Sequence, residues 1–296
     1  MSSSIGFEPL RPLGATREFL ELVKFEHSVF ALPFALIGML LAAEGFPAPS
    51  VLMWLLVAMV SARSVAMAFN RIVDAKLDAL NPRTANRALP AGRLTLAHAW
   101  MFLAVMLGLF VLSTWFLNPL ALRLGPVALA LVMTYSYSKR FTWLSHLWLG
   151  AAIGVAPTAA WIAVTGSLAP GPAWFSAAVM CWIAGFDILY SLADEEFDRV
   201  HRLHSAPARF GATRAIAISR LLHVLTVAML VGGGLALGLG VVYYVGVAVV
   251  AVALAYEQWL VRPNDLTRLN TAFFTANGFV SIALFVFVLA DWMVRR

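Results

Sequence analysis

The sequence predicts an all-α integral membrane protein with about nine transmembrane helices around a central cavity. Three observations support this fold class. Of the 296 residues, 61% are hydrophobic and only 12% are charged, whereas a soluble domain is nearer half apolar and about a quarter charged. The mean hydropathy is +0.84. The apolar residues also fall into runs of about 20, the length that crosses a bilayer as a helix.

The composition excludes several other classes of protein. A chain this apolar has too little polar surface for a cytosolic globular enzyme and too few charges for a disordered chain. The single cysteine, Cys181, cannot form an internal disulfide, so a secreted disulfide scaffold is excluded as well. A polytopic membrane protein is the class that remains.

Nine apolar runs predict the spans, at about 19–43, 51–72, 97–117, 120–138, 143–165, 173–193, 214–238, 241–261 and 271–293. Asn118 and Pro119 separate the third run from the fourth, and a Gly-rich stretch ending at Gly240 separates the seventh from the eighth. The first run is of full spanning length, so no cleavable signal peptide is expected. We expect residues 1–296 to form a single domain.

The basic residues assign the two sides of the membrane. If the N-terminus is cytoplasmic, nearly all of the 21 Lys and Arg residues lie on the cytoplasmic side, the exceptions being Arg63, Arg123, Arg295 and Arg296. The positive-inside rule therefore predicts a cytoplasmic N-terminus and an external C-terminus. This topology explains the net charge of +6, so no nucleic acid partner is expected.

Two acid-rich clusters follow predicted spans on the cytoplasmic side. Asn70, Asp74 and Asp78 form a first ladder at the end of the second span, and Asp194 and Asp198 form a second ladder at the end of the sixth. Residues four apart are separated by 400° of α-helix, so each ladder lies on one helix face. Stacked like charges repel, and each costs about 2.5–3.5 kcal/mol at the centre of a membrane helix. A positive partner is therefore expected at both ladders.

One ionisable residue lies deeper in the membrane beside each ladder. Arg63 is seven residues before Asn70, and Asp187 is seven residues before Asp194. Seven residues are nearly two helical turns, so each shares the face of its ladder and lies about 10 Å below it. Because four spans separate the two clusters, we expect them to face each other across a central cavity, where proteins built from repeats place their sites.

The two ladders predict a site for a divalent cation and a phosphate group. Carboxylate oxygens without Cys or clustered His select hard cations, and Mg²⁺ is typically shared with substrate phosphates. Mg²⁺ that holds a diphosphate between the ladders fits this pattern. Seven nearby bases are available for the remaining phosphate charge: Arg71, Lys76, Arg83, Arg87, Lys139, Arg140 and Arg199.

These residues resemble the motifs of the UbiA superfamily of intramembrane aromatic prenyltransferases. That family carries an Asn-x-x-x-Asp-x-x-x-Asp motif and a later Asp-x-x-x-Asp motif in a nine-helix all-α fold, and the two ladders match them. Arg71 stands where many relatives have Asp, a change that quinone-pathway members tolerate. Residues 83–92 and 135–142 are similar to the family's first cytoplasmic loop and to its basic segment after the fourth span. Segments 24–35 and 186–199 are similar both to the hydroxybenzoate branch and to the branch that acts on a hydroxylated naphthoate.

The resemblance implies Mg²⁺-dependent transfer of a polyprenyl group to a ring carbon of a phenolic aryl acid, in ubiquinone or menaquinone biosynthesis. The donor is a polyprenyl diphosphate whose apolar tail enters from membrane lipid. The acceptor is 4-hydroxybenzoate or a hydroxylated naphthoate. The implied metal ligands are Asp74, Asp78, Asp194 and Asp198, assisted by Asn70.

The resemblance leaves two interpretations for the bases. Lys139 and Arg140 hold either the diphosphate or the carboxylate of the acceptor, and Arg71 and Arg87 are further candidates for the diphosphate. A guanidinium matches the fork of a carboxylate, so Arg63 is the other candidate for the acceptor.

Alternatives also remain open for the deeper residues. Arg63 binds the acceptor or forms a salt bridge to Asp187 or Asp74. Asp187 orients the phenol, takes the ring proton, or serves only as the structural partner of Arg63. Tyr190 and Tyr135 shield a cationic intermediate through their ring faces, or they simply pack in the core.

A membrane transporter of a small anionic substrate is the alternative from another functional class, because transporters also bury charge between repeats. A transporter has no reason to place two acidic ladders beside seven bases on one side only. A phospholipid-headgroup transferase is a weaker alternative, since its Gly- and Arg-containing aspartate signature is absent from this sequence.

Overall fold

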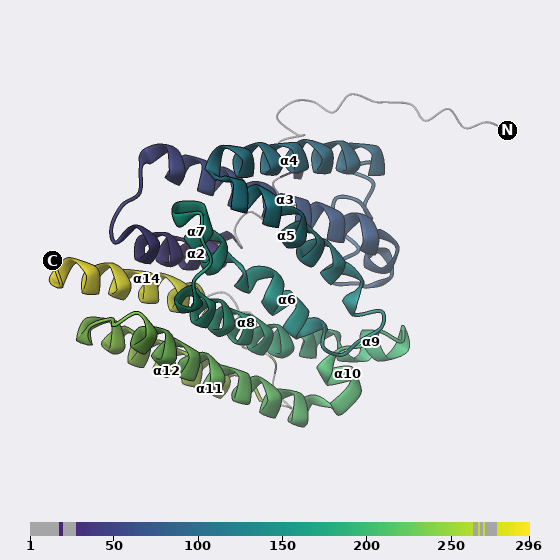
Figure 1. Ribbon diagram of the computed structural model, residues 1–296. Helices are drawn as coiled ribbons and strands as arrows, with labels where there is room; N and C mark the ends of the chain where they lie inside the picture. Colours follow the sequence, from purple (N-terminus) through teal and green to yellow (C-terminus); the bar gives the residue numbers. More distant parts are fainter. Residues whose placement is uncertain (1–17, 20–27, 263–265, 267–268, 270–276) are drawn as a thin grey trace.

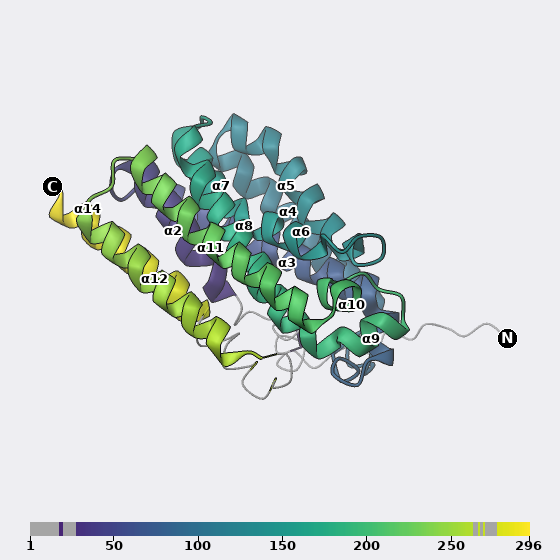
Figure 2. The ribbon, with the colours of Figure 1, turned by 90° about the horizontal axis from the view of Figure 1, so that it is seen from below.

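The computed structural model describes residues 18–19, 28–262, 266, 269 and 277–296. Within these residues the fold is all-helical, as the sequence predicts. The long helices lie side by side in a bundle, with their axes roughly parallel or antiparallel (Figure 1). The view from below shows α11, α12 and α14 on one side of the bundle and α3, α4 and α5 on the other (Figure 2).

The N-terminal helices are α2 (Ser28–Ala43), α3 (Pro49–Leu80), α4 (Leu96–Leu117), α5 (Pro119–Ser138), α6 (Ser145–Gly154) and α7 (Ala156–Thr165). The central and C-terminal helices are α8 (Pro170–Ser191), the 3-10 turn η2 (Leu192–Asp194), α9 (Glu195–Val200), α10 (Ala206–Phe210), α11 (Ala212–Ala236), α12 (Val241–Leu260) and α14 (Asn277–Val294).

Most of the predicted spans correspond to these helices. In the described part of the chain, eight helices are long and apolar enough to cross a membrane, when α6 is taken with α7 and α8 with α9. The first predicted span is represented by α2, whose apolar part, Leu32–Ala43, is shorter. Residues 20–27 of that span and 271–276 of the last span lie outside the described residues. The number nine therefore stays a prediction.

Two helices differ from the predicted spans for local reasons. The predicted span 143–165 is divided at Val155, because Pro157 lies in the first turn of α7 and cannot donate a backbone hydrogen bond to α6. Helix α3 continues eight residues beyond the predicted end at position 72 and stops at Leu80. Asn81 is extended before Pro82, the conformation that a following proline favours. The first ladder therefore lies wholly within a helix and not in a loop.

Helix α8 is the most buried of the spanning helices. It is apolar on all sides, as expected for a helix surrounded by others, and Phe175, Trp182 and Ile183 are fully buried. It packs against α6 and α11. A Cβ added at Gly150 of α6 would come within 2.2 Å of a backbone oxygen of α8, so only glycine permits this approach. Such close contacts between small residues are typical of packed membrane helices.

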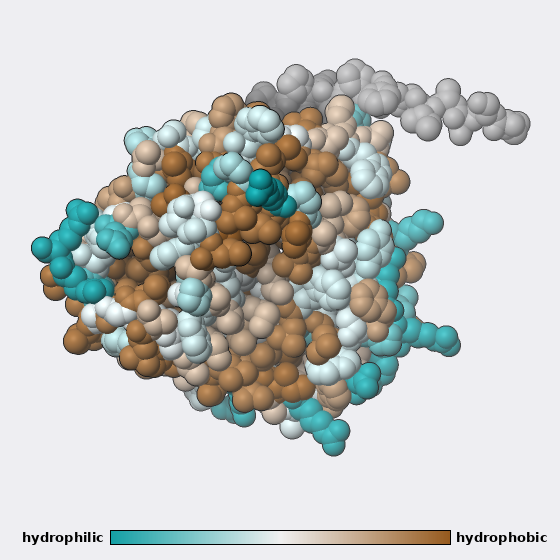
Figure 3. Space-filling model, viewed as in Figure 1, coloured by the Kyte–Doolittle hydropathy of each residue, from teal (hydrophilic) through white to brown (hydrophobic). Residues whose placement is uncertain are grey.

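The outer surface of the bundle is suited to lipid. Large apolar side chains such as Trp115, Leu235 and Val241 are mostly exposed, which a soluble protein avoids over large areas. Figure 3 shows apolar groups over much of one face, with most hydrophilic groups toward the two ends of the helices. The protein is thus a multi-pass membrane protein. The C-terminus lies at the opposite end of the bundle from α9 (Figure 1).

Candidate functional site

A cavity of about 930 Å³ lies between the helices, lined mainly by α3, α5, α6, α7 and α8. Thirteen residues that the sequence assigns to catalysis, substrate binding or metal binding line this one cavity: Arg63, Asn70, Arg71, Asp74, Asp78, Arg87, Tyr135, Lys139, Arg140, Asp187, Tyr190, Asp194 and Asp198. The polar lining comes mostly from the C-terminal ends of α3, α5 and α8, so it is concentrated at one end of the cavity. The two ladders therefore face a common space.

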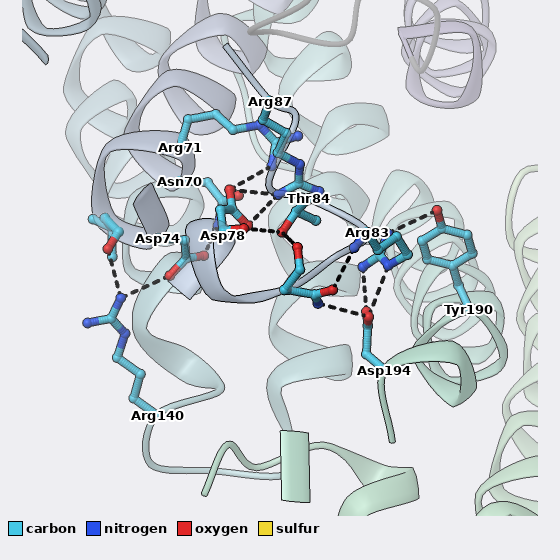
Figure 4. A network of polar contacts seen from close by, with 12 residues as sticks. Asn70, Arg71, Asp74, Asp78, Arg83, Thr84, Arg87, Arg140, Tyr190 and Asp194 are labelled. Carbon is cyan, nitrogen blue, oxygen red and sulfur yellow. Dashed lines mark hydrogen bonds and ion pairs between the residues drawn. The ribbon is translucent and has the colours of Figure 1, made fainter. Parts of the chain in front are cut away.

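The first ladder is a continuous row on α3. The Asn70 amide donates a hydrogen bond of 2.9 Å to Asp74, one turn further along the helix. Arg140 donates to the other oxygen of Asp74 at 2.9 Å. Arg87 donates to both oxygens of Asp78, at 2.7 and 2.8 Å, and Figure 4 shows these groups together. Both carboxylates thus have the positive partner that the sequence requires.

The second ladder does not lie on one helix. Helix α8 ends at Ser191, the turn η2 contains Asp194, and Asp198 lies on the separate short helix α9. The prediction that both acids continue the face of α8 by helical periodicity is therefore wrong in detail. The tighter winding of the 3-10 turn interrupts the α-helical repeat from Leu192 onward, so helical periodicity does not carry over from α8 to the two acids. Both carboxylates are nevertheless buried and line the cavity.

Basic side chains also balance the second ladder. Arg83 donates to Asp194 from its Nε at 2.9 Å and from a terminal nitrogen at 2.5 Å. Its guanidinium also donates to the Tyr190 hydroxyl at 3.3 Å and lies 5.3 Å from the centre of that ring, as Figure 4 shows. Lys139 donates to Asp198 at 3.4 Å. The Tyr190 ring therefore faces a cation in the folded protein.

Two of these cations, Arg83 and Lys139, lie outside the spanning segments and have shifted pKa values. Burial opposes the charged form of Lys139, but the carboxylates of Asp198, Asp187 and Asp194 outweigh it and raise the pKa of the ammonium group. Burial likewise disfavours the charge on Arg83, and its hydrogen bonds to Asp194 more than compensate, so its pKa is raised. Both side chains remain cationic throughout the physiological range.

Two predicted phosphate partners do not reach the cavity. Lys76 is exposed on α3, two residues from each of Asp74 and Asp78 and hence about 200° around the helix from them. Arg199 is exposed on α9 and donates to Glu195 at 2.6 Å. Neither belongs to the cavity lining, so the predicted set of seven bases is too large.

Arg63 lies in the apolar part of the cavity. Within the described part of the chain it forms no ion pair, and its buried Nε has no hydrogen-bond partner. The alternative in which Arg63 is paired with Asp187 or Asp74 is therefore wrong. Asp74 is held by Arg140 at 2.9 Å, and Asp187 is 2.6 Å from the ring of His146.

Sequence reasoning missed two residues that hold the site together. Asn81 accepts a hydrogen bond from the backbone of Arg83 at 3.0 Å and donates to Asp194 at 3.3 Å. Its position before Pro82, where a helix ends, was the available signal. His146 contacts Asp187 across 41 positions of sequence. No local pattern links those two residues, so only the fold reveals the pair.

The oxygen-rich end of the cavity fits Mg²⁺ by its donor chemistry. Among the described residues, no group of three or more His, Cys, Asp or Glu side chains is close enough to hold a metal ion without other ligands. Mg²⁺ sites usually need only one or two carboxylates, with substrate phosphates and water as the other ligands. The two ladders offer carboxylate and amide oxygens on one cavity, which is the donor set that such sites use.

Comparison with known proteins places these features in a family. The model of the UbiA prenyltransferase family matches residues 31–282. The chain is 34% identical to a 4-hydroxybenzoate octaprenyltransferase of Alkalilimnicola ehrlichii, over 86% of each protein. It is 30% identical to a 4-hydroxybenzoate octaprenyltransferase of Saccharophagus degradans, over 97% of each.

Two solved structures share the fold. The apo structure of a UbiA homologue from Aeropyrum pernix K1 is 36% identical, with a TM-score of 0.82 over 90% of this chain and 98% of that one. A UbiA homologue from Archaeoglobus fulgidus, bound to DMAPP and Mg²⁺, is 18% identical, with a TM-score of 0.73 over 94% of this chain and 99% of that one.

Proposed function

Because the chain belongs to the UbiA prenyltransferase family, we propose that this membrane prenyltransferase moves a polyprenyl group from a polyprenyl diphosphate to a ring carbon of a phenolic aryl acid. One observation carries the proposal: the two acid ladders line the same cavity as Arg63, which pairs with no carboxylate among the described residues. Membership in an enzyme family also removes the transporter alternative.

The polar end of the cavity is proposed to hold the diphosphate. Asp74 and Asp78 on one wall and Asp194 and Asp198 on the other would hold Mg²⁺, with Asn70 assisting. Bound Mg²⁺ supplies charge neutralisation for the leaving diphosphate. Each of these carboxylates contacts an Arg or Lys side chain. Those four bases, Arg83, Arg87, Lys139 and Arg140, would be available to bind phosphate oxygens once the metal neutralises the carboxylates. Arg71, which lies 4.0 Å from Asp78, would be available as well.

The remainder of the cavity is suited to the apolar chain of the donor. Its lining includes Met59, Leu124, Leu131, Leu149 and Ile153, which come from α3, α5 and α6. Apolar walls bind a prenyl chain through the hydrophobic effect, and they exclude water that would quench an allylic cation. The volume of about 930 Å³ is at the upper end of ordinary small-molecule sites, as a long chain requires.

The acceptor is proposed to bind between Arg63 and Asp187. The Arg63 guanidinium can take the acceptor's carboxylate in a forked pair, since no described side chain competes for its Nε. The carbon–oxygen bond of the donor breaks, and the diphosphate leaves with the electron pair. The ring carbon beside the phenolic hydroxyl then forms the new carbon–carbon bond and loses its proton. The protein contributes positioning and charge and needs no covalent nucleophile.

We propose 4-hydroxybenzoate as the first acceptor to test, because the relatives at 30–34% identity carry that substrate in their names. A hydroxylated naphthoate is the second. We further propose that the protein lies in the cell (inner) membrane, and the positive-inside rule supports an orientation with the ladders facing the cytoplasm. We also propose that residues 1–296 form a single domain.

The test is product formation in membranes that contain the protein. Membranes are incubated with Mg²⁺, a polyprenyl diphosphate and each aryl acid separately, and products are identified by mass. We expect prenylated acid only with Mg²⁺ present, and only from an acid with a phenolic hydroxyl. Membranes with the Asp74→Asn variant are the matched control. Formation of prenylated product in the presence of EDTA would contradict the proposal, and so would the absence of product from every phenolic acid.

A further inference from the structure

His146 lies behind the cavity wall, where α6, α8 and the start of α10 meet. Its side chain is buried and is not part of the cavity lining. The ring Nδ1 is 2.6 Å from Oδ2 of Asp187. On the other side of the ring, the backbone N–H of Ala206 donates to Nε2 at 3.1 Å. The imidazole therefore bridges a cavity carboxylate and a helix N-terminus.

These two contacts fix the position of the ring proton. A backbone N–H can only donate, so the Nε2 that receives it carries no hydrogen. The proton of the neutral ring is then on Nδ1, where it donates to Asp187. Ala206 is the first residue of α10, and such an N–H has no acceptor within its own helix. The helix end thus requires an acceptor, and this requirement selects the tautomer that donates to Asp187.

The surroundings of His146 hold the ring in place. Gly150, one turn along α6, touches the backbone of α8 so closely that no side chain fits between them. Ser145 donates to the carbonyl of His204 at 3.3 Å, and the backbone of His204 donates to the carbonyl of Lys139. The short segment before α10 is therefore tied to both α6 and the end of α5. A ring that carries a hydrogen bond on each nitrogen and lies between anchored segments can orient the carboxylate that it contacts.

Asp187 differs from the other carboxylates of the cavity. Asp74, Asp78, Asp194 and Asp198 each contact an Arg or Lys. Among the described residues, Asp187 contacts neither, and its partner is the neutral ring of His146. A carboxylate in an ion pair loses that pair when it takes a proton. Among these residues Asp187 forms no such ion pair. When a proton binds its other oxygen, it keeps the hydrogen bond from His146, and only the longer-range attraction to Lys139 is weakened.

We propose that His146 is a positioning residue that holds Asp187 as the acceptor of the ring proton; this inference rests on the proposed function. After the new carbon–carbon bond forms, the carbon–hydrogen bond at the same ring carbon breaks. Its electron pair restores the aromatic ring, and the proton moves to Oδ1 of Asp187, the oxygen that His146 leaves free. His146 Nδ1–H keeps Oδ2 fixed during this step. The proton then leaves Asp187 for water when the product departs.

Steady-state kinetics of two His146 variants test the inference. His146→Ala removes the donor, and we expect kcat to fall about 10–100-fold, the usual effect of removing a supporting contact. The KM values for both substrates should change by less than about twofold, because His146 touches neither. His146→Asn places an amide N–H near the position of Nδ1, and we expect it to recover most of kcat. His98→Ala, at the start of α4 and outside the cavity, is the matched control and should retain wild-type kcat.

An isotope effect separates positioning from a purely structural role. With acceptor deuterated at the ring carbons beside the hydroxyl, a slower proton removal makes the isotope effect on kcat larger in His146→Ala than in the wild type. A loss of packing alone lowers the amount of active protein and leaves the isotope effect unchanged. If the alanine variant does not fold, His146→Leu fills the space without a donor and is measured in the same way.

The outcomes distinguish this inference from the proposed function. Normal kcat in a folded His146→Ala or His146→Leu variant overturns the inference alone, and so does an unchanged isotope effect. An equal loss of kcat in folded His146→Asn also overturns it. If the wild-type protein prenylates no phenolic acid, the proposed function fails, and the inference fails with it.

Discussion

The two ladders have the same four-residue spacing but are built differently. Asp74 and Asp78 lie on one uninterrupted helix of 32 residues. Asp194 lies in a 3-10 turn, and Asp198 lies on a separate helix of six residues. The second ladder is also more deeply buried: the Asp198 side chain is 3% exposed, whereas that of Asp74 is 24% exposed. Equal spacing in sequence therefore does not imply equal geometry.

Despite this difference, bases from the same two connecting segments pair with both ladders. The segment after α3 sends Arg87 to Asp78 of the first ladder and Arg83 to Asp194 of the second. Two consecutive residues after α5 divide in the same way, since Arg140 contacts the first ladder and Lys139 the second. Each of the two connecting segments thus links both ladders. Like charges that would repel within a helix are stabilised by cations from elsewhere in the chain.

The largest effect is expected from removing one carboxylate from either ladder. Asp74→Asn and Asp194→Asn should each lower Mg²⁺-dependent prenyl transfer by about 10²–10³-fold, because each removes a carboxylate proposed to hold the Mg²⁺ that neutralises the leaving diphosphate. Glu196→Gln, an exposed neighbour in α9, is the control and should retain activity. Full turnover in both aspartate variants would remove the metal assignment, and loss at only one would show that the ladders have unequal roles.

The second prediction compares the polar end of the cavity with its interior. Arg63→Ala should raise the KM for the aryl acid about 10–100-fold, since a charged hydrogen bond contributes about 1.5–3 kcal/mol. The KM for the polyprenyl diphosphate should stay nearly constant. Arg123→Ala, exposed on α5, is the matched control. A rise in the donor's KM with the acceptor's unchanged would move Arg63 to the diphosphate.

The third prediction concerns the stability of the second ladder. Because the pKa of Lys139 is raised in the folded protein, its charge stabilises the fold below the unfolded value of about 10.4. This stabilisation is lost as the pH rises through the folded pKa. In detergent with EDTA, Lys139→Met should lower the unfolding temperature by several degrees at pH 7. The gap to wild type should persist to about pH 10 and close above it.

A gap that closes below pH 9 would show that Lys139 does not stabilise Asp198 in this way. Arg140→Met provides the comparison at the first ladder. Its partner Asp74 is more exposed, so a smaller loss of stability is expected from solvent screening. Equal losses in the two variants would mean that burial does not distinguish the ladders.

The sequence was sufficient for the all-helical class of fold and for a set of residues that line one cavity. Helical periodicity placed Asp74 and Asp78 correctly, because α3 is regular over its whole length. The same periodicity failed at Asp194, where the sequence has no signal for a 3-10 turn. It could not assign Arg83 to Asp194, 111 positions away, nor His146 to Asp187. Such pairs depend on helix packing, which local patterns do not encode.

The smallest effect is expected at Tyr190, which lies beside Arg83, the base that pairs with Asp194 of the second ladder. Its hydroxyl accepts a hydrogen bond from Arg83, and its ring lies beside the same guanidinium. Tyr190→Phe removes only the hydroxyl contact, so kcat should fall by about threefold, within the range of one modest hydrogen bond. Tyr190→Leu also removes the ring face and should cost more, since the cation–π contact is lost. If Phe and Leu reduce kcat equally, Tyr190 acts through its hydroxyl alone, and the ring contributes nothing to the position of Arg83 over the second ladder.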